Sequence, residues 1–191
     1  MGDFMLRLKS AEVRFGRRGF VKYRAWVVVG VVTLGVGAWS AWPEKTLPPD
    51  SMADLVVVRK ADRRLELYRG DQLIKAYAVS LGRHPLDRKE QQGDGRTPEG
   101  EYRLDYRNVH SAFHKALHIS YPAPADVAAA HARGLDAGGQ VMIHGMKNGW
   151  GWLGRLHRFV DWTDGCVAVT DAEIDEIWLV VPDGTRIVVK P

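Results

Sequence analysis

The chain has 191 residues, of which 46% are hydrophobic and 26% charged, a balance that fits one globular domain and excludes a disordered chain. The net charge of +4 is unevenly placed. Residues 1–24 hold seven of the 27 basic residues but only two of the 23 acidic ones, so the remainder is close to neutral. Because the basic excess lies in a tail and not on the folded body, the sequence predicts no nucleic-acid partner.

Residues 25–42 contain no charged side chain. As a helix these residues would extend about 27 Å, close to the roughly 30 Å of a bilayer core. The basic residues before them predict a cytoplasmic tail at 1–24 and export of the rest of the chain. We therefore expect residues 25–42 to be a transmembrane anchor in the inner membrane. A cleaved signal segment is the alternative, because Ala38 and Ser40 are small residues that suit a cleavage site.

The rest of the chain divides into a proline-rich linker at residues 43–53 and one folded domain at 54–191. β-branched or alternating runs predict strands at residues 55–59, 64–69, 73–80, 101–105, 141–144, 166–170 and 186–190. Helices are predicted at 125–133 and 171–181, the second with Thr170 or Asp171 as N-cap. The expected fold class is mainly β, a sandwich or closed barrel with one or two covering helices, preceded by the membrane helix.

The sequence contains one cysteine, Cys166, which therefore has no partner for an internal disulfide. Gly165 permits a tight backbone before it, and the strand that follows would hold the thiol rigidly. Such a turn can direct the N–H groups of Gly165 and Cys166 at a developing oxyanion. A buried core cysteine is the alternative interpretation.

A second candidate residue, His144, ends a predicted strand and is followed by Gly145. An imidazole at the end of a strand stands on a rigid scaffold, where catalytic groups are frequent, although a single such histidine is more often structural. Together with Cys166 it forms a possible nucleophile and base, since a thiol with an ordinary pKa needs a base to react at neutral pH.

These residues resemble a known signature. His144-Gly145, followed by Thr163-Asp-Gly-Cys166 before a strand, is similar to the L,D-transpeptidase (YkuD-type) catalytic domain, whose pattern is a His, a gap and Ser/Thr-His-Gly-Cys. An earlier block also resembles the family: Ser80-Leu-Gly-Arg83, Pro85, Lys89 and the run from Gly93 to Gly100. The resemblance covers about residues 54–189.

The resemblance implies that Cys166 is the acylated nucleophile and His144 its base. It further implies that Gly145 orients the imidazole and that Gly165 and Cys166 form the oxyanion hole. The implied substrate is the stem peptide of bacterial peptidoglycan, on the periplasmic side of the inner membrane. The implied reactions are 3→3 cross-linking or attachment of an outer-membrane lipoprotein, with no metal or cofactor. Hydrolysis by the same site and a non-catalytic murein-binding module are the alternatives.

Three features depart from the family pattern. Asp164 replaces the second histidine, Ala168 replaces a polar residue, and the segment between His144 and Thr163 is longer. A carboxylate at Asp164 would raise the pKa of the neighbouring thiol unless it points away or pairs with Arg or His. With these departures, the sequence resembles more closely the branch of this family that includes enzymes cutting or forming the link between murein and a lipoprotein.

The longer segment, residues 147–162, contains three tryptophans and three glycines. It predicts a lid in which Trp150 and Trp152 contact substrate and Arg155 and Arg158 pair with a stem-peptide carboxylate. A loop packed on the core, with solvated arginines, is the alternative. A spacing of four also links His110, His114 and His118, but the chain there reads as extended and lacks a fourth ligand, so we predict no metal site.

Overall fold

The computed structural model describes residues 45–191. The predicted tail at 1–24 and the predicted membrane segment at 25–42 lie outside these residues. Within residues 45–191, no helix has both the length and the apolar character needed to cross a membrane.

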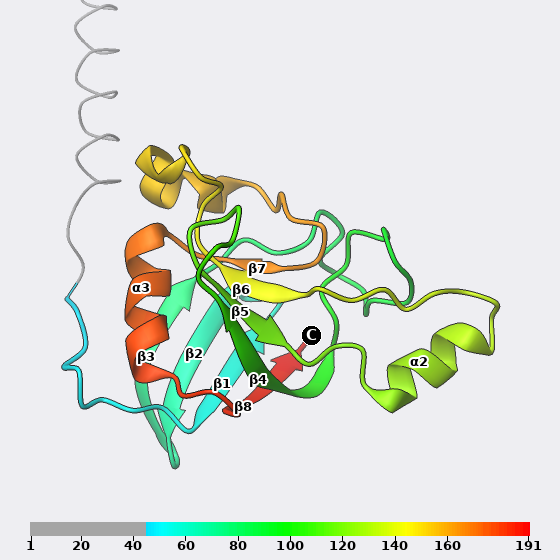
Figure 1. The fold of residues 1–191 in the computed structure, drawn as a ribbon, viewed down its shortest axis with the longest axis horizontal. Coiled ribbons are helices and arrows are strands. Elements are labelled where there is room, and N and C mark those ends of the chain that lie inside the picture. Colours follow the sequence, from blue (N-terminus) through cyan, green and yellow to red (C-terminus); the bar gives the residue numbers. More distant parts are fainter. Residues whose placement is uncertain (1–44) are drawn as a thin grey trace, which may run out of the picture. The chain divides into compact units, whose positions relative to one another are not determined.

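The described part of the chain is built on an eight-stranded sheet with the order β3-β2-β1-β8-β4-β5-β6-β7 (Figure 1). The strands are β1 (Leu55–Arg59), β2 (Arg64–Arg69), β3 (Gln72–Ala78), β4 (Gly100–Asn108), β5 (Ala116–Ile119), β6 (Met142–His144), β7 (Val167–Ala168) and β8 (Arg186–Lys190). The helices are α2 (Pro124–His131) and α3 (Asp171–Val180), with a 3₁₀ segment η1 (Gly151–Phe159).

The sheet is curled into a half-barrel. The β1–β8 and β6–β7 pairs are parallel and the other neighbours are antiparallel. Beyond the end of β3, two isolated bridges join Ser80 to Ala168 and Gly82 to Thr163. The mainly β class is thus confirmed, but the arrangement differs from the expected sandwich or closed barrel. The edge strands meet only at these two bridges, so the sheet closes at one end alone.

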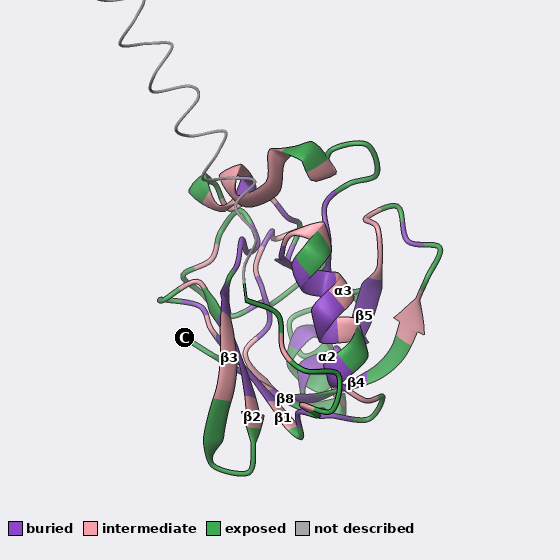
Figure 2. Ribbon diagram, turned by 90° about the vertical axis from the view of Figure 1, so that its left-hand side faces the viewer, coloured by how far each residue is buried: buried purple, intermediate pink, exposed green. Residues whose placement is uncertain are grey.

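Alternation of side chains along the strands creates the core. In β1 and β2 the residues of the hydrophobic core, Val56, Val58, Leu65 and Leu67, lie two apart, as the period of a strand requires, although Val57 between them is buried too. Helix α3 covers the sheet with buried aliphatic residues (Figure 2). Its start is confirmed at Thr170, whose Oγ1 accepts the N–H of the third helical residue, while the carboxylate of that residue accepts the Thr170 N–H.

Two regions differ from the sequence prediction. The short strand β5 was not predicted, because all four of its residues are buried and give no alternation. The proline-rich segment was expected as an extended spacer, yet its described part contacts the body. The carbonyl of Lys45 accepts a bond from Lys75, and the N–H of Leu47 donates to the Glu176 carboxylate.

Candidate active site

The pairing of β6 with β7 brings the two candidate catalytic residues to one face of the sheet. In this parallel pair, His144 lies opposite Ala168 and Ile143 opposite Val167. Cys166 stands two residues before Ala168, so its side chain and that of His144 leave the sheet on the same side. Both line one pocket of about 360 Å³. The structure therefore brings together residues that are 22 positions apart in the chain.

The His144 imidazole is held in one orientation. Its Nδ1–H donates to the carbonyl of Gly145 at 2.6 Å, which leaves Nε2 as the free acceptor. The rings of Phe113 and Trp162 contact it, with centroids at 4.6 and 5.7 Å. The side chain is only 4% exposed, and this burial lowers the pKa of His144. At neutral pH the ring is thus neutral and able to accept a proton.

The Cys166 thiol is partly exposed to the pocket and donates weakly to the carbonyl of Gln140, with 3.7 Å between sulfur and oxygen. Burial is the main cause that raises the pKa of Cys166, and the Asp164 carboxylate adds to it, whereas the Lys89 ammonium acts in the opposite direction. The raised pKa of Cys166 and the lowered pKa of His144 therefore favour a neutral thiol and a neutral imidazole in the same pocket.

The loop before the thiol is shaped by Thr163. Its Oγ1 accepts the N–H of Gly165 at 3.1 Å and its hydroxyl donates to the carbonyl of Cys166 at 2.8 Å. Gly165 has φ +127, and a Cβ there would lie 2.5 Å from the carbonyl oxygen of Arg96, so only glycine fits. Because the Gly165 N–H is bonded to Thr163, the expected oxyanion role of Gly165 and Cys166 stays a prediction.

Asp164 is exposed, lines the same pocket and forms an ion pair with Arg83. This is one of the two arrangements that limit the effect of a carboxylate next to a thiol. Arg83 stands in the earlier block that resembles the family, and its backbone N–H also donates to the carbonyl of Thr163 at 3.0 Å. The two separated sequence blocks are thus joined around the nucleophile.

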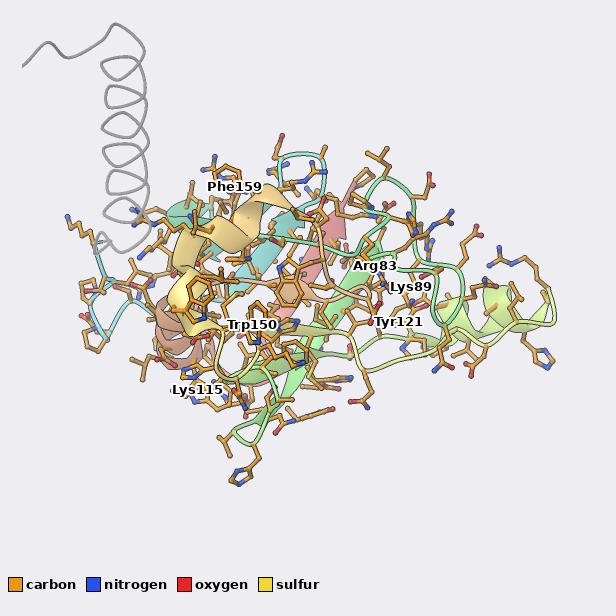
Figure 3. The ribbon with its side chains drawn as sticks, turned by 90° about the horizontal axis from the view of Figure 1, so that it is seen from above. Arg83, Lys89, Lys115, Tyr121, Trp150 and Phe159 are labelled. Atoms are coloured by element: carbon orange, nitrogen blue, oxygen red, sulfur yellow. The ribbon has the colours of Figure 1, made fainter. Side chains whose placement is uncertain are left out.

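Lys89 and the glycine-rich run from Gly93 to Gly100 pack against the loop that precedes Cys166. Lys89 is buried and donates to Asp94 at 2.8 Å. Burial acts to raise the pKa of Asp94, but bonds from Lys89 and from the backbone N–H groups of Glu90, Gln91 and Arg96 lower it to about 2. The Lys89 ammonium lies 4.0 Å from the position of a Cβ on Gly165. Figure 3 labels Lys89 together with Arg83, the ion-pair partner of Asp164. Asp94 of this run therefore holds the Lys89 cation close to the loop that precedes Cys166.

The predicted lid is largely the 3₁₀ segment η1 and its flanks. Trp150 and Trp152 stack with centroids 6.4 Å apart and are 52% and 73% exposed. Arg158 forms an ion pair with Glu173, and Arg155 is half-buried. None of the four residues Trp150, Trp152, Arg155 and Arg158 lines the pocket of Cys166. Their substrate-binding role stays a prediction.

Several residues of the pocket were not found from the sequence. The walls around His144 and Cys166 include the side chains of Ser111, Phe113, Gln140, Met142, Lys147 and Trp162. Gln140 is marked by its backbone conformation and not by a sequence pattern, because its φ of +57 is uncommon for a residue with a side chain. The histidines spaced four residues apart in the sequence have different partners, since His114 contacts Asp175 and His118 contacts Asp105.

Comparison with known proteins identifies the family of this chain. A model of the YkuD family, described as the L,D-transpeptidase catalytic domain, matches residues 53–189. YafK of Escherichia coli (strain K12), which carries a provisional L,D-transpeptidase name, is 31% identical over 130 residues, which cover 64% of this chain and 45% of YafK. The chain therefore spans less than half the length of this curated relative.

Solved structures share the fold. The helical cell shape determining protein Pgp2 from Campylobacter jejuni is 20% identical with a TM-score of 0.56, covering 81% of this chain and 54% of Pgp2. Bd1075 from Bdellovibrio bacteriovorus is 21% identical with a TM-score of 0.50, covering 76% of this chain and 54% of Bd1075. Because the family model matches most of this chain, the chain belongs to the YkuD family of L,D-transpeptidase catalytic domains.

Proposed function

We propose that this protein transfers acyl groups of peptidoglycan stem peptides through a thioester on Cys166. The observation that carries the proposal is the shared pocket of Cys166 and His144, in which the bond from Nδ1 to the Gly145 carbonyl leaves Nε2 as a base. A thiol and an imidazole in one pocket are the groups that acyl transfer uses, and the description of the matching family supports the same reaction class.

In the first half-reaction, His144 Nε2 takes the thiol proton as the sulfur attacks the carbonyl carbon of the third stem residue. The tetrahedral intermediate collapses by breaking the amide bond, and His144 returns the proton to the departing D-alanine amine. In the second half-reaction an acceptor attacks the thioester carbon and gives a proton to His144. The carbon–sulfur bond breaks, and the released thiolate recovers that proton.

A carbapenem tests the nucleophile, because its strained ring acylates a reactive thiol of this kind. Intact-mass measurement of the full chain with meropenem should show one adduct on the wild type and none on Cys166→Ala. His144→Gln should form the adduct much more slowly, since the base is removed. A wild type without an adduct, or an equal adduct on Cys166→Ala, refutes the proposal.

The acceptor decides the product. A stem-peptide amine gives a 3→3 cross-link, a lysine of an outer-membrane lipoprotein gives an anchored lipoprotein, and water gives a shortened stem. We propose amine transfer as the main reaction, acting in wall synthesis and cell shape, with hydrolysis in the same pocket as the second candidate. Incubation with defined muropeptides and mass analysis separates an amide product from a hydrolysed tripeptide.

We further propose that residues 25–42 anchor the protein in the inner membrane with the catalytic domain in the periplasm. The support is the uncharged run behind a basic tail. An alkaline phosphatase fusion placed after the catalytic domain should be active in cells, since this reporter folds only after export. Retention of the full-length mass in the membrane fraction supports an anchor over a cleaved signal segment, whereas a shortened soluble product contradicts it.

A further inference from the structure

Exposed aromatic side chains gather on η1 and its flanks. Phe159, Trp152 and Trp150 are 75%, 73% and 52% exposed, and Val160 beside them is 65% exposed. Among residues 45–191, no other tryptophan or phenylalanine is exposed. A group of large exposed apolar side chains marks an interaction surface, whereas scattered single ones are ordinary. We call residues 150–160 the aromatic segment.

The aromatic segment lies at one end of the described body. Figure 1 shows η1 at the top of the view, above α3 and β7, and Figure 3 labels Trp150 and Phe159 at its two ends. The backbone is kinked at Gly154, and an ion pair from Arg158 to Glu173 joins the segment to α3. The aromatic side chains are therefore presented from a support that is attached to the body.

The aromatic segment adjoins the pocket of Cys166 without lining it. It forms one wall of a separate apolar cavity of about 330 Å³, which shares Lys147 and Trp162 with that pocket. Trp152 and Phe159 line neither cavity and point to the surface instead. Whatever contacts these two rings is thus outside the catalytic pocket but close to it.

The charges along this part of the chain have one sign. Residues 147–160 contain Lys147, Arg155 and Arg158 and no acidic residue. The acidic residue that follows, Asp161, is bonded to Arg63. Apolar rings interspersed with basic residues are typical of segments that lie in the interface of a bilayer with anionic lipids, where tryptophan is enriched. The composition therefore favours a lipid surface over an acidic or a purely apolar partner.

The link to the proposed membrane anchor joins the body beside the aromatic segment. Leu47 packs against the core, and its N–H donates to the Glu176 carboxylate of α3. Glu173, the partner of Arg158, lies three residues before Glu176 in the same helix. Residues with this spacing on a helix are neighbours, about 5–6 Å apart. The chain thus leaves the body close to the aromatic segment.

Little chain separates this attachment from the proposed anchor. The uncharged run ends at residue 42, and the carbonyl of Lys45 already accepts a bond from Lys75 of the body. Three residues extend at most about 11 Å. The polar layer on each side of a hydrocarbon core is roughly 5–8 Å thick. If residues 25–42 span the bilayer, a link of this length keeps the attached side of the body at the lipid surface.

We propose that the aromatic segment docks onto the bilayer that holds the anchor, with Trp152 and Phe159 inserted at the boundary of headgroups and acyl chains. The occupant of this surface is a phospholipid bilayer that contains anionic lipids, so Trp152 contacts lipid and not substrate. Docking rests on the proposed anchor and goes beyond the proposed acyl transfer. It gives the pocket of Cys166 a fixed orientation to the membrane.

A small gain per side chain is enough for this contact. Each ring that leaves water for the interface contributes hydrophobic free energy. The anchor makes the contact intramolecular, and a short link gives it a high effective concentration. The aromatic segment therefore needs no strong affinity for lipid of its own.

Single fluorescent labels test the contact. In the Cys166→Ala background, Trp152→Cys and Phe159→Cys each give one labelling site on the aromatic segment, and Val127→Cys gives the matched control. Val127 is also an exposed apolar residue, and it belongs to α2, which Figure 1 and Figure 3 both show at the opposite end of the described body from η1. Each full chain carries a nitrobenzoxadiazole dye and is placed in nanodiscs of phosphatidylethanolamine and phosphatidylglycerol.

Part of the lipid carries a nitroxide near the top of an acyl chain, where it quenches only dyes that lie beside it. The dyes at positions 152 and 159 should emit at shorter wavelength than in an exposed site and lose most of their fluorescence to the nitroxide. The dye at position 127 should keep both its wavelength and its intensity. Equal quenching at all three positions overturns the proposal, because it shows no preferred face.

The outcomes separate docking from the anchor. If the full chain does not co-elute with the nanodiscs, the anchor fails, and docking fails with it. Co-elution without quenching at positions 152 and 159 overturns docking alone. A blue shift at these positions that appears only at high protein concentration, without nitroxide quenching, assigns the surface to a second copy of the chain and also overturns docking.

Discussion

The buried imidazole of His157 makes the stability of the fold depend on pH, and the variant His157→Gln isolates its share. Glutamine keeps an N–H that can donate to Ser80 but has no titration near neutral pH. The wild-type side chain is 6% exposed, and burial, assisted by the Arg158 charge, lowers the pKa of His157 to about 4. Acidification should therefore destabilise the wild type more than the variant.

The magnitude follows from the two pKa values of His157. In the unfolded chain the ordinary value is 6.5, so the unfolded state takes up a proton before the folded state does. The stabilisation that the folded state gains from holding His157 neutral is complete above pH 6.5 and is lost as the pH falls toward 4. Integrated from about pH 7.5 to about pH 4.5, the loss is roughly 2.5 kcal/mol of unfolding free energy. His144, whose pKa is also lowered, acts in the same direction in both proteins.

Urea unfolding of the full chain in detergent, followed by near-ultraviolet circular dichroism, gives the free energy at each pH. The wild type should lose roughly 2.5 kcal/mol more than His157→Gln between these two pH values, with equal urea slopes. Asp94 does not contribute, because its own window, from 3.8 to about 2, lies below this range. Equal losses in the two proteins would show that His157 is not held neutral by burial.

Three further predictions concern the loop around the nucleophile. Asp164→Asn should lower the pKa of the Cys166 thiol, because a like charge is removed. The pH curve of its alkylation by iodoacetamide should then shift to lower pH, and an unmoved curve contradicts this. Gly165→Ala should cost at least about 2 kcal/mol in urea unfolding, because its Cβ would lie 2.5 Å from a carbonyl oxygen. Lys89→Met should cost roughly 3 kcal/mol in the same assay, since it leaves the Asp94 carboxylate buried without its cation.

The strands were predictable where their sequence alternates between apolar and charged residues or forms a β-branched run. Residues 55–59, 64–69 and 186–190 were predicted with the bounds that β1, β2 and β8 have, because alternation or a β-branched run marks each of them. The strand expected at 166–170 is only two residues long in the structure. The Val169 N–H still donates to the carbonyl of His144 in β6 at 3.0 Å, but the next N–H, that of Thr170, is bonded to the Glu173 carboxylate in the cap of α3.

Cys166 and His144 could be selected from the sequence as candidates, since one is the only cysteine and the other a histidine at the end of a predicted strand, and the structure places both in one pocket. Their surroundings could not be selected in this way. Phe113 and Gln140 come from separate loops, and only the fold brings them into the pocket of Cys166 and His144. No spacing in the sequence marks a loop residue that contacts a site through tertiary packing.

The same burial that shapes the pocket also decides when the nucleophile forms. It lowers the pKa of His144 and raises that of Cys166, so it works against a resting thiolate–imidazolium pair. A protonated thiol is a poor target for oxidants, which protects the only cysteine of a chain that we propose to be exported. In the proposed acyl transfer, proton transfer must then accompany attack on a bound carbonyl, where the developing oxyanion and the imidazolium stabilise each other. The proposed mechanism therefore requires substrate to be in place before the thiol loses its proton.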